Sequence, residues 1–281
     1  MTQQDKFYNE ILEALKNGNL LLPTLPEVAL HVRDVVEEPD VTAKQLAEII
    51  TTDAALSTRL IKVANSALYR GRILSESIQM AVSRLGLNMV RNLVISLVME
   101  QMFQATSNRL DKRLHDLWEH STEVAARSQI LAQKHPNIKS DEAMLAGLIH
   151  NIGMLPILMK AEDTPELLQD TRLLDDVIDR LHNKVGAAIL ESWDFSEPLV
   201  AVPREYSNLE WDSKNGPDLV DIVQVAHIQS LENTDNAIDP AKFEDSKAFK
   251  KLGLDTGMSV SELDEDSEEY AEALALFGFD V

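Results

Sequence analysis

Apolar side chains recur every three or four residues along most of the chain, which is the spacing of one face of an α-helix. Leu46, Ile49 and Ile50 show it, and so do Leu56 and Leu60. No alternation of apolar and polar residues is long enough for a convincing strand. The pattern therefore predicts an all-α protein with no significant sheet.

Start and stop signals divide this pattern into short helices. Thr24 with Glu27 has the spacing of a capping box, and Pro26 fits the first turn. Further candidate N-caps precede the next apolar segments: Thr42 (with Gln45), Asp53, and Ser75 or Ser77. Gly86 is a candidate stop before a longer apolar helix through Val90–Val98. These closely spaced segments predict a compact helical subdomain over residues 1–105.

Two further regions follow. A second helical block, predicted over residues 106–238, carries inward-facing positions at Leu110, Leu114 and Leu117. Residues 239–281 form an acidic helical tail, which has nine acids and no Lys or Arg from Asp255 onward. Its apolar end supports two interpretations. Either Leu274, Leu276 and Phe277 pack on the body, or the tail is an arm that docks a partner or masks the protein itself.

Charge and composition exclude several classes of function. The 281 residues carry a formal net charge of −21, which disfavours binding to nucleic acids and anionic membranes. The absence of cysteine excludes disulfides, thiol nucleophiles and cysteine metal sites. The N-terminus does not resemble a secretory signal. The longest apolar stretch, 143–159, is interrupted and shorter than the roughly 20 residues of a membrane span. We therefore expect a cytoplasmic protein.

Histidines are the main candidates for chemistry. His120, His150, His182 and His227 lie at or near the apolar faces of separate predicted helices. In a helix bundle they can converge and hold a metal ion. Taken singly, each of them is more typical of an ordinary hydrogen-bonded core histidine. No glycine-rich phosphate loop, nucleophile elbow or His-Glu-x-x-His motif is present.

Several stretches, in the right order, give the chain a resemblance to the HDOD family, a degenerate relative of the HD-domain metal-dependent phosphohydrolases. They are LLPTLPEVAL, LAEIITTDAALSTRLIKVANSALY, SIQMAVSRLGLNMVRNLV, LWEHSTEVAA and DEAMLAGLIHNIGMLPIL, between residues 21 and 158. The resemblance covers about residues 20–235. It implies an N-terminal multi-helix HDOD subdomain packed on a degenerate HD-like helical bundle.

The resemblance also implies a damaged metal site. In active HD enzymes a histidine, a His-Asp pair and a distant aspartate hold the metal. Here His120 and His150 match the two histidines, while Asn151 and His227 stand where the two aspartates are expected. His182 matches a histidine of the two-metal phosphodiesterases, whose following His-His pair is replaced by Tyr206 and Ser207. We therefore expect no cofactor, although the remaining imidazoles leave Zn²⁺ or Ni²⁺ open.

The function implied by the resemblance is a bacterial signal-transduction module, regulatory or output, that acts through protein partners. The HD motif would then be inactive and no residue catalytic. The alternative is a metal-dependent phosphohydrolase or phosphodiesterase with unusual histidine ligands. A third hypothesis is a sensor that binds a nucleotide in the old cleft without cleaving it.

Overall fold

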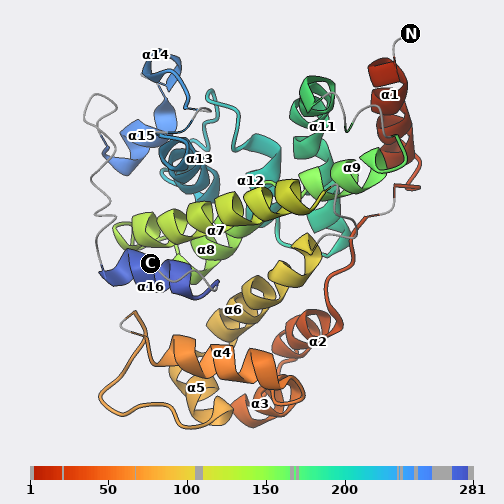
Figure 1. Ribbon diagram of the computed structural model, residues 1–281. Helices are drawn as coiled ribbons and strands as arrows, with labels where there is room; N and C mark the ends of the chain where they lie inside the picture. Colours follow the sequence, from red (N-terminus) through yellow and green to blue (C-terminus); the bar gives the residue numbers. More distant parts are fainter. Residues whose placement is uncertain are drawn as a thin grey trace.

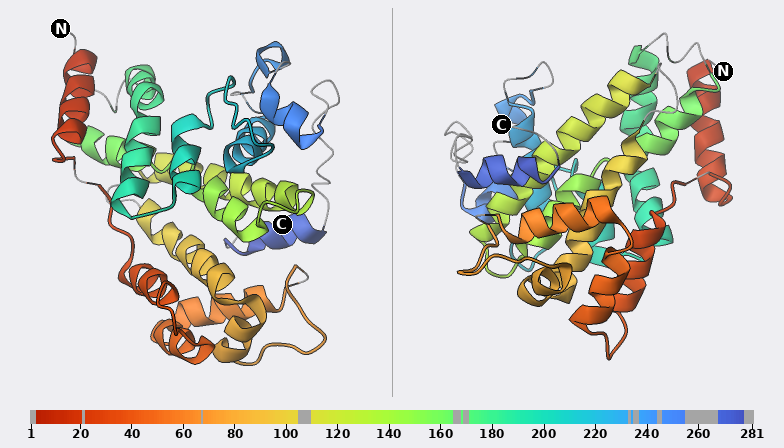
Figure 2. Two further views of the ribbon diagram at one scale, coloured as in Figure 1. Left: turned by 180° about the vertical axis from the view of Figure 1, so that it is seen from behind. Right: turned by 60° about the horizontal axis from the view of Figure 1, so that its bottom comes forward.

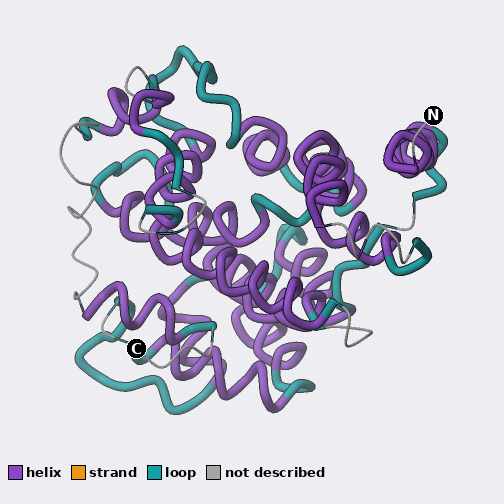
Figure 3. Tube along the Cα trace, turned by 45° about the horizontal axis from the view of Figure 1, so that its top comes forward, coloured by secondary structure: helices purple, strands orange, loops and turns teal. Residues whose placement is uncertain are grey.

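The computed structural model describes residues 3–254 and 268–277, apart from 21, 67, 105–109, 165–167, 169–170, 233, 235–236 and 244–245. Within these ranges every regular element is a helix, and the tube in Figure 3 contains no strand. The prediction of an all-α fold without a sheet is therefore confirmed.

Four short helices gather at one end of the molecule, at the bottom of Figure 1. They are α2 (Glu27–Val36), α3 (Ala43–Ile50), α4 (Ala54–Ala64) and α5 (Ile78–Leu85). The longer α6 (Leu87–Met99) packs against α2, α4 and α5 and also against α8. Nine of its residues are buried, from Val90 to Met99, so α6 joins this group to the rest of the core.

Local capping explains where these helices start. Thr42 and Gln45 form a complete capping box, Asp53 accepts from Leu56 N at 2.9 Å, and the Ser77 hydroxyl accepts from Met80 N at 3.2 Å. Gly86 ends α5 with φ at +83°, a conformation that favours glycine. The capping box predicted at Thr24 is wrong. Pro26 is the N-cap, without a side-chain bond, and its extended backbone delays the helix to Glu27.

The remaining long helices form a bundle. They are α7 (Asp111–Gln133), α8 (Ser140–Ile149), α9 (Met154–Ala161), α11 (Thr171–Ser192), α12 (Glu197–Glu205) and α13 (Leu219–Ser230). The 3₁₀ helix η1 (Glu100–Phe103) leads towards α7. Figure 1 and the right-hand view of Figure 2 show α7 running across the bundle. Because α7 packs against both α8 and α13, side chains from these three helices meet.

Helices at the ends of the chain cover this bundle. The first, α1 (Gln3–Lys16), packs against α11, while α15 (Lys247–Leu252) packs against α13, beside the short α14 (Pro240–Phe243). The predicted boundaries after residues 105 and 238 stay predictions, and the buried core runs without a break through both blocks.

The last helix, α16 (Glu268–Ala275), packs against α7. Phe277 meets the Trp118 ring edge-on at 5.9 Å between centroids, and Arg127 lies 5.4 Å from the centre of the Tyr270 ring. Leu276 and Phe277 are buried and Leu274 is partly buried, as the packed interpretation of the tail expects. Five of the nine acids from Asp255 onward fall in 255–267, outside the described residues.

One apolar segment is longer than the sequence pattern indicated. Residues Ser140–Ala161 form a stretch of 22 residues that meets the length and hydropathy of a membrane span, and α5 with α6 do so together only across a bend of 116°. However, 83% of the apolar window at Ser140–Ala161 is buried inside the protein. Such burial is typical of the core helix of a globular domain.

Candidate functional site

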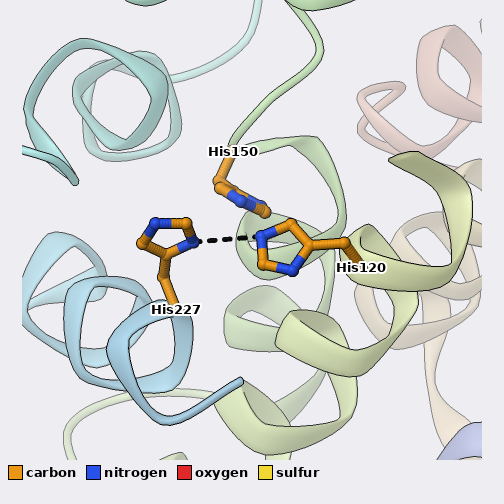
Figure 4. Close-up of side chains that lie close together, drawn as sticks. All are labelled: His120, His150 and His227. Carbon is orange, nitrogen blue, oxygen red and sulfur yellow. Dashed lines mark hydrogen bonds between the residues drawn. The ribbon is translucent and has the colours of Figure 1, made fainter. Parts of the chain in front are cut away.

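Three histidines, from α7, from the C-terminal end of α8 and from α13, converge in the bundle (Figure 4). His120 comes from the middle of α7, His150 follows the last residue of α8, and His227 lies on α13. His120 Nε2 and His227 Nδ1 are 3.1 Å apart, and one ring nitrogen from each residue lies within 4.8 Å of the others. We call these three residues the histidine cluster. The helix crossings of α7 with α8 and α13 build it.

His150 has one ring nitrogen whose lone pair accepts no hydrogen bond from the described residues. His150 is fully buried, and its Nδ1 lies 2.6 Å from the Gly147 carbonyl oxygen. Since a carbonyl only accepts, Nδ1 carries the proton and Nε2 carries a lone pair. His150 Nε2 has no hydrogen-bond partner among the described residues. A buried nitrogen of this kind is either costly or kept for a ligand.

The cluster is uncharged near neutral pH. Burial lowers the pKa of His120 to about 4 and the pKa of His227 to about 3. The pKa of His150 lies well below its usual range, first because of burial and then because of its neighbours His120 and His227. The site therefore offers three neutral imidazoles, which is the protonation state in which histidine binds metals.

His182 lies outside the cluster, although the resemblance grouped it with the others. Its Nδ1 is 2.7 Å from the Ile178 carbonyl oxygen, so it donates there, and its Nε2 accepts from the Tyr206 hydroxyl at 2.8 Å. The Tyr206 ring stands edge-on to His150 at 4.8 Å and to His227 at 5.0 Å between centroids. Tyr206 thus separates His182 from the cluster, and its hydroxyl donates to the one free lone pair of His182, on Nε2.

Asn151 is buried next to the cluster and bonds to α7. Its Oδ1 accepts from the Ser121 hydroxyl at 2.9 Å, and its Nδ2 has no partner among the described residues. The spacing of apolar residues gave no reason to single out Ser121. Its position directly after His120 was the one available signal.

The turn after Asn151 lies against the backbone of α11. A Cβ on Gly153 would overlap the His182 carbonyl oxygen and the Gly186 amide nitrogen. Only glycine allows this close approach, and the approach fixes the position of His150 and Asn151 relative to α11.

The donor set decides which ions fit. Among the described residues, the group able to hold a metal contains three histidines and no carboxylate. Neutral imidazoles suit Zn²⁺ or Ni²⁺, whereas Mg²⁺ and Ca²⁺ need oxygen ligands. A zinc ion with Zn–N distances of about 2.0–2.1 Å needs nitrogens roughly 3.3 Å apart. His120 Nε2 and His227 Nδ1, 3.1 Å apart, already meet this spacing, and the widest pair of the cluster would have to close by up to about 1.5 Å.

A cleft of about 710 Å³ opens beside His120. Its apolar wall includes Leu117, Met154 and Leu158. Of the described residues that line it, Arg113 is the only Lys or Arg, and it pairs with Asp175 at 3.0 Å. The acids lining the cleft are Asp116, Glu119, Glu123, Asp175 and Asp179. The cleft, which reaches the histidine cluster at His120, is therefore acidic. Partial burial raises the pKa of Asp179 above its usual value.

Comparison with known proteins identifies the family and the fold. The family model of the HDOD domain matches residues 22–209. Among curated proteins, an uncharacterised protein of Treponema pallidum (strain Nichols) is 28% identical over 221 residues. The match covers 74% of this chain but only 42% of that protein, so the chain spans less than half the length of this relative.

Solved structures of similar fold come from several bacteria. A Shewanella amazonensis SB2B protein, provisionally named a metal-dependent phosphohydrolase, is 34% identical with a TM-score of 0.84, covering 99% of this chain and 100% of that one. An HDOD domain protein of unknown function from Geobacter sulfurreducens is 22% identical with a TM-score of 0.69, covering 98% of each chain. A provisionally named signal transduction protein from Marinobacter aquaeolei VT8 is 20% identical with a TM-score of 0.65, covering 99% of this chain and 67% of that one. The last two support the fold alone.

Proposed function

Since this chain belongs to the HDOD family, we propose that it is a regulatory or output module of signal transduction that acts through protein contacts and hydrolyses no phosphate ester. The observation that carries the proposal is the donor set of the histidine cluster, in which no carboxylate from the described part of the chain joins His120, His150 and His227. The expected partners are proteins, because the net charge of −21 disfavours nucleic acids and anionic membranes.

The missing carboxylates matter for hydrolysis. A carboxylate neutralises the charge of the metal and can bridge two ions, and an assembled metal site activates water as a nucleophile. Asn151 and His227 stand where the resemblance expects aspartates, and both are neutral. A Zn²⁺ or Ni²⁺ ion held by the cluster would be a Lewis acid without these partners. The chain supplies imidazoles for binding and, in the motif positions, no carboxylate base for water.

The acidic cleft beside His120 also disfavours phosphate-ester hydrolysis. A phosphate ester would approach the cluster past five carboxylates and one arginine that is already paired. Like charges in a cleft raise the energy of an anionic ligand and lower its local concentration. An entrance of this kind disfavours phosphorylated substrates and nucleotides, and it favours cations and basic side chains.

We therefore expect inorganic phosphate, AMP and GMP to leave the melting temperature of the purified protein unchanged, because a ligand stabilises only when it binds the native state. The measurement is a thermal-shift titration, with sodium chloride at equal ionic strength as the control. A dose-dependent rise that disappears in a His120→Ala variant would support the nucleotide-sensor hypothesis instead.

Metal-dependent phosphohydrolysis is the second candidate. It is favoured by the histidine cluster and by the Shewanella amazonensis protein, which is 34% identical and provisionally named for that activity. This function requires turnover that depends on added metal and is lost in both His120→Ala and His150→Ala variants. Metal-dependent turnover therefore distinguishes the phosphohydrolase from the signalling module.

A further inference from the structure

The loop between α4 and α5 is exposed and projects from the end of the molecule, at the lower left of Figure 1. Ile73 and Leu74 are 73% and 58% exposed, although both are large aliphatic residues. Arg70 and Arg72 beside them are exposed, and neither forms an ion pair with any described residue. Residues Arg70–Leu74, the RGRIL loop, therefore present two cations and two apolar side chains on a protein of net charge −21.

Hydrogen bonds from Asn65 and Arg84 hold the RGRIL loop in place. The Asn65 amide donates to the Ser75 carbonyl at 2.9 Å and accepts from the Ser75 amide at 2.7 Å. Arg84 on α5 donates to the carbonyl oxygens of Ala64 and Ile73. Asn65 and Arg84 thus fix both ends of the loop and keep Ile73 from folding inward. Such preorganisation lowers the entropy cost of binding at an exposed apolar loop.

A complementary surface exists on the same molecule. The cleft beside His120 has five acids and an apolar wall. Its charge is opposite to that of the RGRIL loop, and both surfaces combine charged with apolar side chains. Asp116 and Asp179 are exposed acids of this cleft for which no salt bridge is observed in the described part of the chain. Complementary charges of this kind fix register and speed association.

We infer that the RGRIL loop of one copy docks into the acidic cleft of a second copy, and that the reverse contact forms across a two-fold axis. The inference rests on the proposed function, in which the cleft receives a protein and no phosphate ester. Arg70 and Arg72 meet the carboxylates of the cleft, while Ile73 and Leu74 cover its apolar wall. Two equal contacts make the interface closed and self-complementary. A small interface of exposed charges is weak and salt-sensitive.

Sedimentation velocity of the full chain over a wide concentration range tests this inference. We expect a reversible monomer–dimer equilibrium that shifts to monomer at high salt. The double variant Arg70→Glu/Arg72→Glu and the double variant Asp116→Lys/Asp179→Lys should each raise the dimer dissociation constant about tenfold or more. Ile73→Ser/Leu74→Ser should weaken the dimer as well. Circular dichroism verifies that each variant is folded.

Two comparisons separate docking from a general charge effect. Lys44→Glu/Lys62→Glu changes the net charge as much as the loop variant does, at exposed sites of the same subdomain, and should leave the dimer intact. An equimolar mixture of the two charge-reversed variants should dimerise again, because one contact pairs the two reversed surfaces and the other contact is native. A monomer at every concentration, or a dimer unaffected by both reversals, would overturn the inference. Neither result depends on whether the protein hydrolyses phosphate esters.

Discussion

Replacing Gly153 by alanine is expected to destabilise the folded protein by about 3 kcal/mol or more. The new Cβ would overlap backbone atoms of His182 and Gly186, and backbone cannot move aside as a flexible side chain can. Either α9 or α11 must shift, and both have buried inner faces. Urea denaturation followed by circular dichroism measures the loss, and we expect a much lower midpoint or a chain that does not fold.

Gly71 provides the matched control for this substitution. A Cβ at Gly71 would lie 3.5 Å from Arg84 Nε, an ordinary contact with a side chain, and no positive φ is recorded there. Gly71→Ala should therefore change stability by no more than about 0.5 kcal/mol. Equal and small effects at both glycines would mean that the turn after Asn151 does not approach α11 as closely as described.

Zinc is expected to stabilise the protein through the histidine cluster. Free Zn²⁺ at 100 times its dissociation constant would raise the free energy of unfolding by about 2.7 kcal/mol. The stabilisation should be lost in His227→Ala, because that substitution removes one of three imidazoles. Mg²⁺ should have no effect, since it prefers oxygen ligands. Calorimetric titration and thermal unfolding give the affinity and the shift.

The control for the zinc experiment is an exposed histidine outside the histidine cluster. His31 is exposed on α2, so His31→Ala lowers the histidine count without touching the cluster and should keep the full effect of zinc. An equal zinc shift in His227→Ala would contradict a site built on the cluster.

Local features of the fold could be predicted because they depend on neighbouring residues. Thr42, Asp53 and Ser77 cap helices as their sequence context indicates, since each bond spans three residues. The same reasoning failed at Thr24, where the extended backbone of Pro26 set the start of the helix. Capping signals of this kind are accurate only when no stronger restraint on the backbone lies beside them.

The site was predictable only in part. Apolar spacing placed His120, His150, His182 and His227 on inner faces of helices, but no spacing says which faces cross. The resemblance supplied the grouping, and it included His182. The Tyr206 hydroxyl occupies His182 Nε2 across 24 positions of sequence, a contact that no local pattern encodes. The acidity of the cleft was equally hidden, because its residues come from α7, α11 and other segments far apart in the chain.

The rate of phosphate-ester hydrolysis by the purified protein shows whether the histidine cluster is catalytically inactive. The substrates are bis-p-nitrophenyl phosphate, p-nitrophenyl phosphate and a set of linear and cyclic nucleotides, each with Zn²⁺, Ni²⁺, Mn²⁺ or Mg²⁺. His120→Ala and His150→Ala are prepared in the same way. We expect that no metal gives the native protein a rate above that of the two variants. Metal-dependent turnover that is present in the native protein and absent from both folded variants would contradict it.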